Sequence, residues 1–140
     1  MKGYIGNIEK ETQSNENFRK VVYTGKHLQL VLMSLKIGED IGEETHPFND
    51  QFFRFESGTG TCIIDGKEYY VGEGDVIVVP AGAKHNVINT GISVPFKMYT
   101  IYGPPNHQDG TVRVTKVDAE NNPEQFDGKT SEKIAAADLY

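Results

Sequence analysis

The sequence lacks the features that mark a secreted or membrane-bound protein. It has one cysteine, Cys62, among 140 residues, so no disulfide can form within the chain and nothing indicates an oxidising compartment. The run 61–64 around it is typical of a strand, and a buried, inert thiol is the expected role. No hydrophobic run approaches the length of a membrane span, and the N-terminal residues turn polar before a signal sequence develops. We therefore expect a cytoplasmic protein with no membrane partner.

Runs of basic residues are also missing. Lys and Arg are scattered singly, and the formal net charge is −6. Binding to phosphate backbones needs a concentrated basic surface, so nucleic acid is not an expected partner.

Helical patterns long enough to link parallel strands are absent, which argues against a βαβ architecture. Instead, short runs rich in Val, Ile, Tyr, Phe and Thr alternate with turns rich in Gly, Asp and Asn. Asp65-Gly66 lies between two such runs and predicts a tight hairpin. The pattern predicts an all-β sandwich or barrel of about nine strands. The expected strands are 18–23, 28–35, 51–55, 61–64, 68–71, 75–79, 85–88, 95–102 and 111–116.

The C-terminal part differs in composition. Residues 118–129 are acidic and lack a hydrophobic pattern, so they are expected to form a loosely ordered connector. Good helix formers follow in 131–140, with Ser131 as a suitable N-cap, and predict a short terminal helix. We therefore expect a single domain over 1–140, with a barrel core at about 18–117 and the connector and helix in 118–140.

Two of the four histidines lie in segments that suit metal binding. Glu44 and His46 are two residues apart, so on an extended backbone both side chains point to the same face. Gln51 opens the next strand after a short turn. His85 starts the strand that returns after a buried strand and a Pro-x-Gly turn. His27, in a polar turn, is expected to be an ordinary surface residue.

These two segments resemble the two sequence motifs of the cupin family, in the correct order. The resemblance covers roughly 28–102, and it implies a cupin-type double-stranded β-helix, or jelly-roll, barrel. The second motif, G-x5-P-x-G-x2-H-x3-N, is matched at Gly74, Pro80, Gly82, His85 and Asn89. The first, G-x5-H-x-H-x3,4-E-x6-G, is matched in spacing through Gly38, Glu44, His46, Gln51 and Gly58.

The resemblance also implies a metal site, with two departures from the family pattern. Glu44 stands where the first histidine usually lies, and Gln51 stands where the glutamate usually lies. With His46 and His85, the implied set has two imidazoles, one carboxylate and one amide oxygen. Such a set suits one divalent Fe, Mn, Ni or Zn ion, whereas Ca²⁺ and Mg²⁺ prefer oxygen cages. A metal-free cupin that has lost its site is the alternative, although Glu and Gln both remain able to ligate.

Other residues are candidates for the pocket. Phe53 and Phe55 share the strand parity of the glutamine ligand, so they are expected to line the barrel, as core or as a substrate wall. Tyr99 is expected to line the pocket at its rim. Tyr102 and His107 are candidates for an acid or base, with a surface role as the alternative.

Several functions fit this pattern. The first is a metal-dependent enzyme of the isomerase or lyase type, acting as a Lewis acid on a sugar-like or enolisable carbonyl compound. Neutral Gln51 leaves the site more positive, which favours this class over a cupin dioxygenase using Fe, Mn or Ni. A non-catalytic small-ligand-binding or scaffold cupin is the third hypothesis. The partner is then a small molecule. The resemblance to cupins, which commonly pair through strand edges, also implies a homodimer with strand 18–23 as the exchange element, and this is compatible with all three hypotheses.

Overall fold

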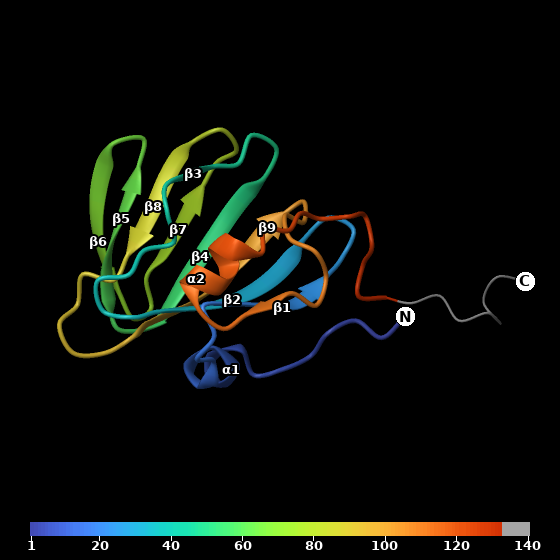
Figure 1. Ribbon diagram of the computed structural model, residues 1–140, viewed down its shortest axis with the longest axis horizontal. Coiled ribbons are helices and arrows are strands. Elements are labelled where there is room, and N and C mark those ends of the chain that lie inside the picture. The colour runs from blue at the N-terminus through green and yellow to red at the C-terminus, as the bar shows by residue number, and fades with distance from the viewer. Residues whose placement is uncertain (133–140) are drawn as a thin grey trace, which may run out of the picture.

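Two antiparallel β-sheets face each other in the computed structural model, which describes residues 1–132 (Figure 1). One sheet has six strands, in the order β10 (Val112–Arg113), β1 (Arg19–Thr24), β2 (Gln29–Leu35), β9 (Phe96–Gly103), β4 (Asp50–Ser57) and β7 (Val76–Val79). The other has four, in the order β3 (Glu44–Thr45), β8 (Lys84–Ile88), β5 (Thr59–Ile64) and β6 (Lys67–Gly72). The predicted all-β jelly-roll class is confirmed.

Successive side chains of each strand point to opposite faces, so every second side chain lies between the two sheets. In β9, Phe96, Met98, Thr100 and Tyr102 are buried, while the residues between them are partly exposed. Aromatic rings stack in this core, and the ring centroids of Phe55 and Phe96 lie 4.7 Å apart. This period of two is what half-buried strands require.

Cys62 is fully buried in this core, in β5. Burial raises the pKa of its thiol to about 12, so the reactive thiolate is not formed near neutral pH. The thiol therefore has the inert role expected from its sequence setting.

Tight turns fix the ends of several strands. The predicted hairpin joins β5 to β6, and both turn residues, Asp65 and Gly66, have positive φ, 46° and 81°. Gly58 also has positive φ, and a side chain there would meet the Pro95 carbonyl at 2.6 Å. Buried Asn89 donates to the carbonyls of Leu35 and Val94, so it joins three segments of backbone.

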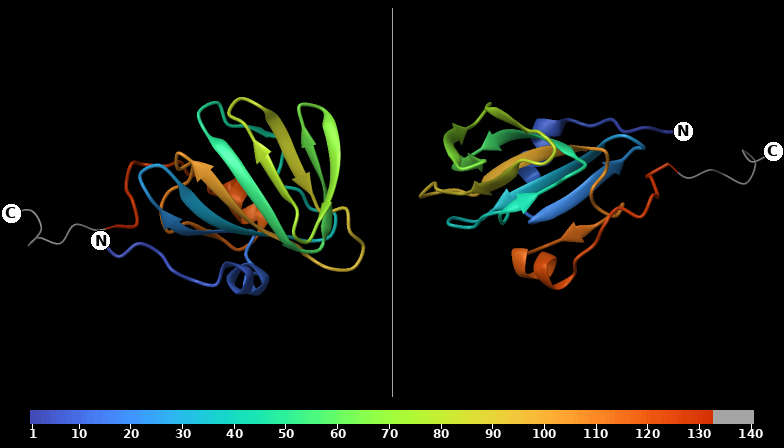
Figure 2. Two further views of the ribbon diagram at one scale, coloured as in Figure 1. Left: turned by 180° about the vertical axis from the view of Figure 1, so that it is seen from behind. Right: turned by 90° about the horizontal axis from the view of Figure 1, so that it is seen from above.

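Two short helices lie outside the sheets (Figure 2). The first, α1 (Ile8–Ser14), packs against β4 and β9 of the six-stranded sheet. The second, α2 (Lys116–Asn121), is capped by Thr115, whose hydroxyl accepts a hydrogen bond from the Asp118 N–H.

A short C-terminal helix was predicted and is present as α2, although it lies before the expected 131–140, and α1 was not predicted. Residues 118–121 are helical, so the expectation of a loose connector from 118 onward is wrong at its start. Six residues are too few to show a helical hydrophobic period, which explains the omission. Most of the expected terminal helix 131–140 lies outside the described residues.

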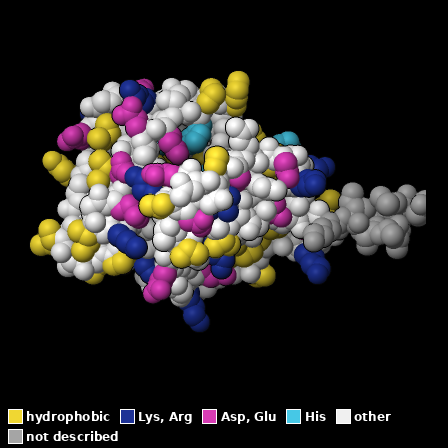
Figure 3. All heavy atoms as spheres, viewed as in Figure 1, with side chains coloured by type: hydrophobic (Ala, Val, Ile, Leu, Met, Phe, Trp, Pro, Cys, Tyr) yellow, Lys and Arg dark blue, Asp and Glu magenta, His cyan; other side chains and the backbone are white. Residues whose placement is uncertain are grey.

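The molecular surface carries both signs of charge. On the face drawn in Figure 3, Lys and Arg side chains lie among Asp and Glu rather than in one basic patch. Within residues 1–132, no helix is long and apolar enough to cross a lipid bilayer.

Candidate metal centre

Glu44, His46 and His85 meet between the two sheets. Glu44 in β3 and His85 in β8 are direct partners across the antiparallel pair, and His46 follows β3 by one residue. One ligand atom from each of the three residues lies within 4.8 Å of the others. The Glu44 Oε2 and His46 Nε2 atoms are 3.0 Å apart. The parity argument therefore places Glu44 and His46 correctly.

Gln51 reaches the same point from the opposite sheet. It lies in β4, and its Oε1 atom is 3.1 Å from His85 Nε2. Its amide nitrogen donates to the Thr100 hydroxyl at 3.0 Å, which directs the oxygen toward the histidine. All four predicted ligand positions are thus brought together.

The contact between His85 and Gln51 has the chemistry of a cation site. His85 Nδ1 lies 3.2 Å from the Ala83 carbonyl, so Nδ1 carries the proton in the neutral ring. The Nε2 lone pair then faces the Gln51 oxygen, and two acceptors oppose each other. Protonating the ring would resolve this, but burial lowers the pKa of His85 and favours the neutral form. A metal ion between the two atoms resolves it as well, and the donor set fits such an ion.

The Glu44 carboxylate is held in its charged form. Burial alone would raise its pKa, but the hydrogen bond and electrostatic interaction with His46, followed by the charge of Arg19, lower the pKa overall. An ionised carboxylate beside two imidazoles is the protonation state that a divalent transition metal needs.

A buried hydrogen-bonded chain extends from this cluster. The ring of Tyr102 packs edge-on against His46, and its hydroxyl lies 3.2 Å from His107 Nε2. His107 Nδ1 lies 2.8 Å from Glu124 Oε1. Burial raises the pKa of Tyr102, so the phenol stays protonated and donates. The structure thus places both candidate acid–base residues next to the cluster rather than at the surface.

The expected pocket-lining residues divide into two groups. Phe53 and Phe55 point inward with Gln51, and the Phe53 ring lies 6.3 Å from the His85 ring. Tyr99 does not line the pocket, contrary to expectation. It alternates with inward-facing Thr100 and Tyr102, so its ring lies on the outer face of β9, against Phe52.

The sequence analysis missed two residues that belong to the site. Glu124, from the presumed connector, is the partner of His107, and Arg19 of β1 lies 3.6 Å from the same carboxylate. Arg19 shares its strand parity with buried Val21, so a charged residue on the inner side of a strand was the available signal. No local pattern marks Glu124, because its contact depends on the path of the chain after β9.

Comparisons with known proteins support one family. Residues 31–102, about half of the chain, match the family Cupin_2, described as a cupin domain. The uncharacterized protein YrkC of Bacillus subtilis is 49% identical over 124 residues, covering 84% of this chain and 66% of that protein. The uncharacterized protein L612 of Acanthamoeba polyphaga mimivirus is 44% identical, covering 81% of this chain and 72% of that protein. The chain thus spans about two thirds of the first relative's length.

A solved structure agrees with this. The crystal structure of BH2720 from Bacillus halodurans matches with a TM-score of 0.84 and 44% identity, over 86% of this chain and 96% of that one. Together with the two facing sheets and the matched family region, these likenesses leave one assignment: the chain belongs to the cupin family.

Proposed function

We propose that this chain binds one divalent transition metal through Glu44, His46, Gln51 and His85, and acts with it on a small oxygenated molecule. The observation that carries the proposal is the convergence of these side chains from β3 and the residue after it, from β4 and from β8, at contact distances of 3.0 and 3.1 Å. Two imidazoles with one carboxylate and one amide oxygen suit Fe, Mn, Ni or Zn.

The reaction class that the surroundings favour is enolisation, isomerisation or elimination at a carbonyl compound. The metal, when bound, would polarise a substrate oxygen as a Lewis acid. Tyr102 supplies a protonated hydroxyl beside His46, and His107 accepts the hydrogen bond of that hydroxyl. Glu124 holds the opposite nitrogen of His107 and so fixes which ring nitrogen accepts. A proton can therefore be held or passed at the Tyr102 oxygen, away from bulk water.

Metal analysis tests the first part of the proposal. The protein is purified without a metal-affinity tag, and bound metal is measured by elemental analysis. We expect about one divalent transition metal per chain in the wild type and almost none in Glu44→Ala, since loss of one ligand commonly weakens metal binding by orders of magnitude.

Glu43→Ala is the matched control. Glu43 is the adjacent carboxylate, but it pairs with Lys84 in an exposed ion pair, so this variant should keep its metal. Full occupancy in Glu44→Ala, with circular dichroism like that of the wild type, would remove Glu44 from the ligand set.

Hydrogen exchange tests the reaction class. Metal-loaded protein is incubated in D₂O with hydroxyaldehydes, hydroxyketones and uronates, and deuterium next to the carbonyl is followed by NMR. We expect incorporation in one of these classes, slowed about 100-fold or more in Tyr102→Phe. Oxygen consumption with enediols or flavonols, without such exchange, would instead support a dioxygenase.

A further inference from the structure

A cleft of about 280 Å³ opens beside the metal cluster, between β1, residues 41–44 and α2. Glu44 lines it, so the cleft and the cluster share one side chain. The rest of its wall is formed by Phe18, Arg19, Ile41, Gly42, Glu43, Lys116, Ala119 and Glu120.

Arg19 is the unusual member of this wall because its charge is buried. Only 9% of the residue is exposed, and its Nε atom has no hydrogen-bond partner within residues 1–132. Its ion-pair partner is Glu124, at 3.6 Å from Nη1. Its guanidinium carbon lies 5.5 Å from the centroid of the Phe18 ring. A buried cation with so few partners is costly unless another anion completes its shell.

Glu124 cannot fully neutralise Arg19, because the same carboxylate serves two other groups. It lies 2.8 Å from His107 Nδ1 and 3.5 Å from Arg113 Nη2.

The other cation of the cleft, Lys116, is already paired with Asp40. Glu44 also lies within electrostatic range of Arg19, but it is directed at His46. Arg19 is therefore the cation of this wall that is left with spare hydrogen-bonding capacity.

We propose that this cleft is an anion subsite, in which Arg19 binds a carboxylate of the substrate while the substrate's other oxygens reach the metal cluster past Glu44. This inference rests on the proposed function and narrows it to small carboxylic acids. Phe18, Ile41 and Ala119 supply apolar wall, which suits a short carbon skeleton between the two polar ends. Arg is also the side chain best suited to bidentate carboxylate binding.

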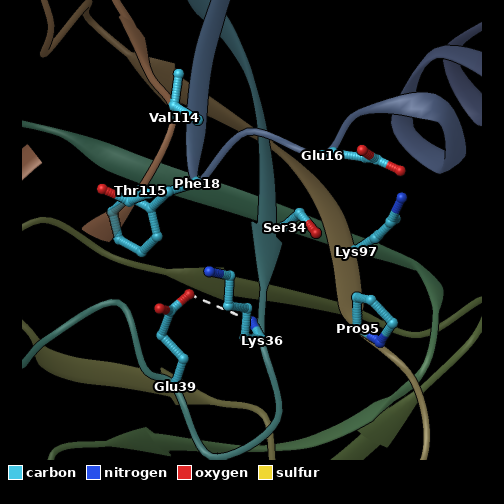
Figure 4. A pocket seen from close by; sticks show the side chains of 9 residues that line it. All are labelled: Glu16, Phe18, Ser34, Lys36, Glu39, Pro95, Lys97, Val114 and Thr115. Atoms are coloured by element: carbon cyan, nitrogen blue, oxygen red, sulfur yellow. Dashed lines mark hydrogen bonds between the residues drawn. The ribbon is translucent and has the colours of Figure 1, made fainter. Parts of the chain in front are cut away.

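A second cleft of similar volume, about 260 Å³, shows the contrast (Figure 4). None of the four cluster residues lines it. Its lysines lie among glutamates, and the Lys36 N–H donates to Glu39 at 3.2 Å (Figure 4). Its two lysines are matched in number by two glutamates, whereas Arg19 is buried next to the metal cluster.

Calorimetry with matched probes tests the inference on the wild-type protein. Protein loaded with Mn²⁺, and the same protein stripped of metal, are titrated with succinate and with its neutral analogue succinamide. We expect succinate to bind both forms, more tightly with the metal, and succinamide to bind at least about tenfold more weakly. Equal binding of the two probes, or no binding of succinate to either form, would overturn the proposal.

Variants assign the effect to Arg19. Arg19→Gln should weaken succinate binding about 10- to 100-fold, because it removes a charge-assisted pair. Arg113→Gln is the matched control, since Arg113 pairs with the same Glu124 but lies outside the cleft and donates to the Asn122 carbonyl. Unchanged succinate binding in a folded Arg19→Gln protein would refute the subsite. If that variant does not fold, the comparison of succinate with succinamide decides the question alone.

The two proposals fail in different ways. If the wild type retains none of Fe²⁺, Mn²⁺, Ni²⁺ and Zn²⁺, the metal site is wrong, and Arg19-dependent succinate binding by the stripped protein would still support the anion site. If Mn²⁺ is retained at one per chain and the affinity for succinate is unchanged in Arg19→Gln, the metal site stands and the anion subsite is wrong.

Discussion

Gly60 shows how one residue can be fixed by close packing alone. It lies in β5 with ordinary negative φ, yet a Cβ atom there would come within 2.3 Å of the Phe96 ring and 2.5 Å of the Ile88 carbonyl. The backbone of β5 therefore approaches β8 and the core more closely than any side chain permits. The cupin motif flags Gly58, whose φ is positive, but not Gly60, whose constraint arises only from the packed sheets.

Gly60→Ala should lower the free energy of unfolding by about 2 kcal/mol or more, because a backbone carbonyl cannot move aside as a side chain can. Urea denaturation followed by circular dichroism measures this. Gly72→Ala is the control, since its nearest atoms are 3.6 Å away and its change should stay within about 0.5 kcal/mol. A Gly60→Ala protein as stable as Gly72→Ala would contradict the packing described here.

Among the elements, the segment that follows β9 has the largest effect on the site. It runs back past the cluster, supplies His107 and Glu124, and carries α2 across to the Asp40 segment through the Lys116 ion pair. Two buried hydrogen bonds anchor it to β2: the Gln29 amide nitrogen donates to the His107 carbonyl, and the His107 N–H donates to the Gln29 amide oxygen. The segment is thus a fixed wall of the site rather than a connector.

The buried His107 and Glu124 of this segment predict that the protein loses stability on acidification. Burial lowers the pKa of His107 in the folded state, so below about pH 6.5 the unfolded chain binds a proton that the folded chain does not. Burial alone would raise the pKa of Glu124, but its interactions with His107, Arg19 and Arg113 together lower it, so this carboxyl adds a further loss only below about pH 4.5. The free energy of unfolding of metal-free protein should therefore fall as the pH drops from about 7 to about 5.

Urea melts at several pH values measure this slope, and His107→Gln should make it shallower. His27→Gln is the control, because His27 is exposed in a turn and its replacement should leave the slope unchanged. Parallel slopes in all three proteins would show that His107 does not carry the effect.

At the scale of the whole molecule, the candidate site exists because two sheets close on each other. Glu44 and His85 are paired in one sheet, whereas Gln51 and Tyr102 are paired in the other. The four ligand positions therefore meet only when both sheets are formed. Homodimerisation and a single domain over 1–140 remain predictions.

The chain's own pairing changes where a dimer contact is expected. Strand β1 is hydrogen-bonded on both sides, to β2 and to β10, so exchange of this strand would first require β10 to leave. By contrast, β7 is an edge strand of the six-stranded sheet, and it exposes Val76 and Val78, the latter at 61%. Unpaired edges with exposed Val are natural sites of strand addition.

Light scattering should therefore give a mass near twice the 15.6 kDa of one chain, and Val78→Lys should shift it toward one chain. Val117→Lys, on α2, is the control and should remain dimeric, since Val117 is equally exposed but lies away from this edge. A monomeric wild type would refute the dimer, and a dimeric Val78→Lys would move the contact away from β7.

The sequence by itself determined the features that depend on local backbone chemistry. The period of two along the strands and the Asp65-Gly66 turn each act over a few residues, so the all-β class could be predicted from them, and the Glu44-x-His46 spacing placed those two side chains together. The jelly-roll topology and the addition of Gln51 and His85 to the cluster were predicted from the resemblance to the cupin motifs. The outward direction of Tyr99, the placement of His107 against Tyr102, and the roles of Arg19 and Glu124 were decided only by the tertiary structure. Their contacts join β1, β9 and the segment after β9, and no local preference encodes a meeting of residues so far apart along the chain.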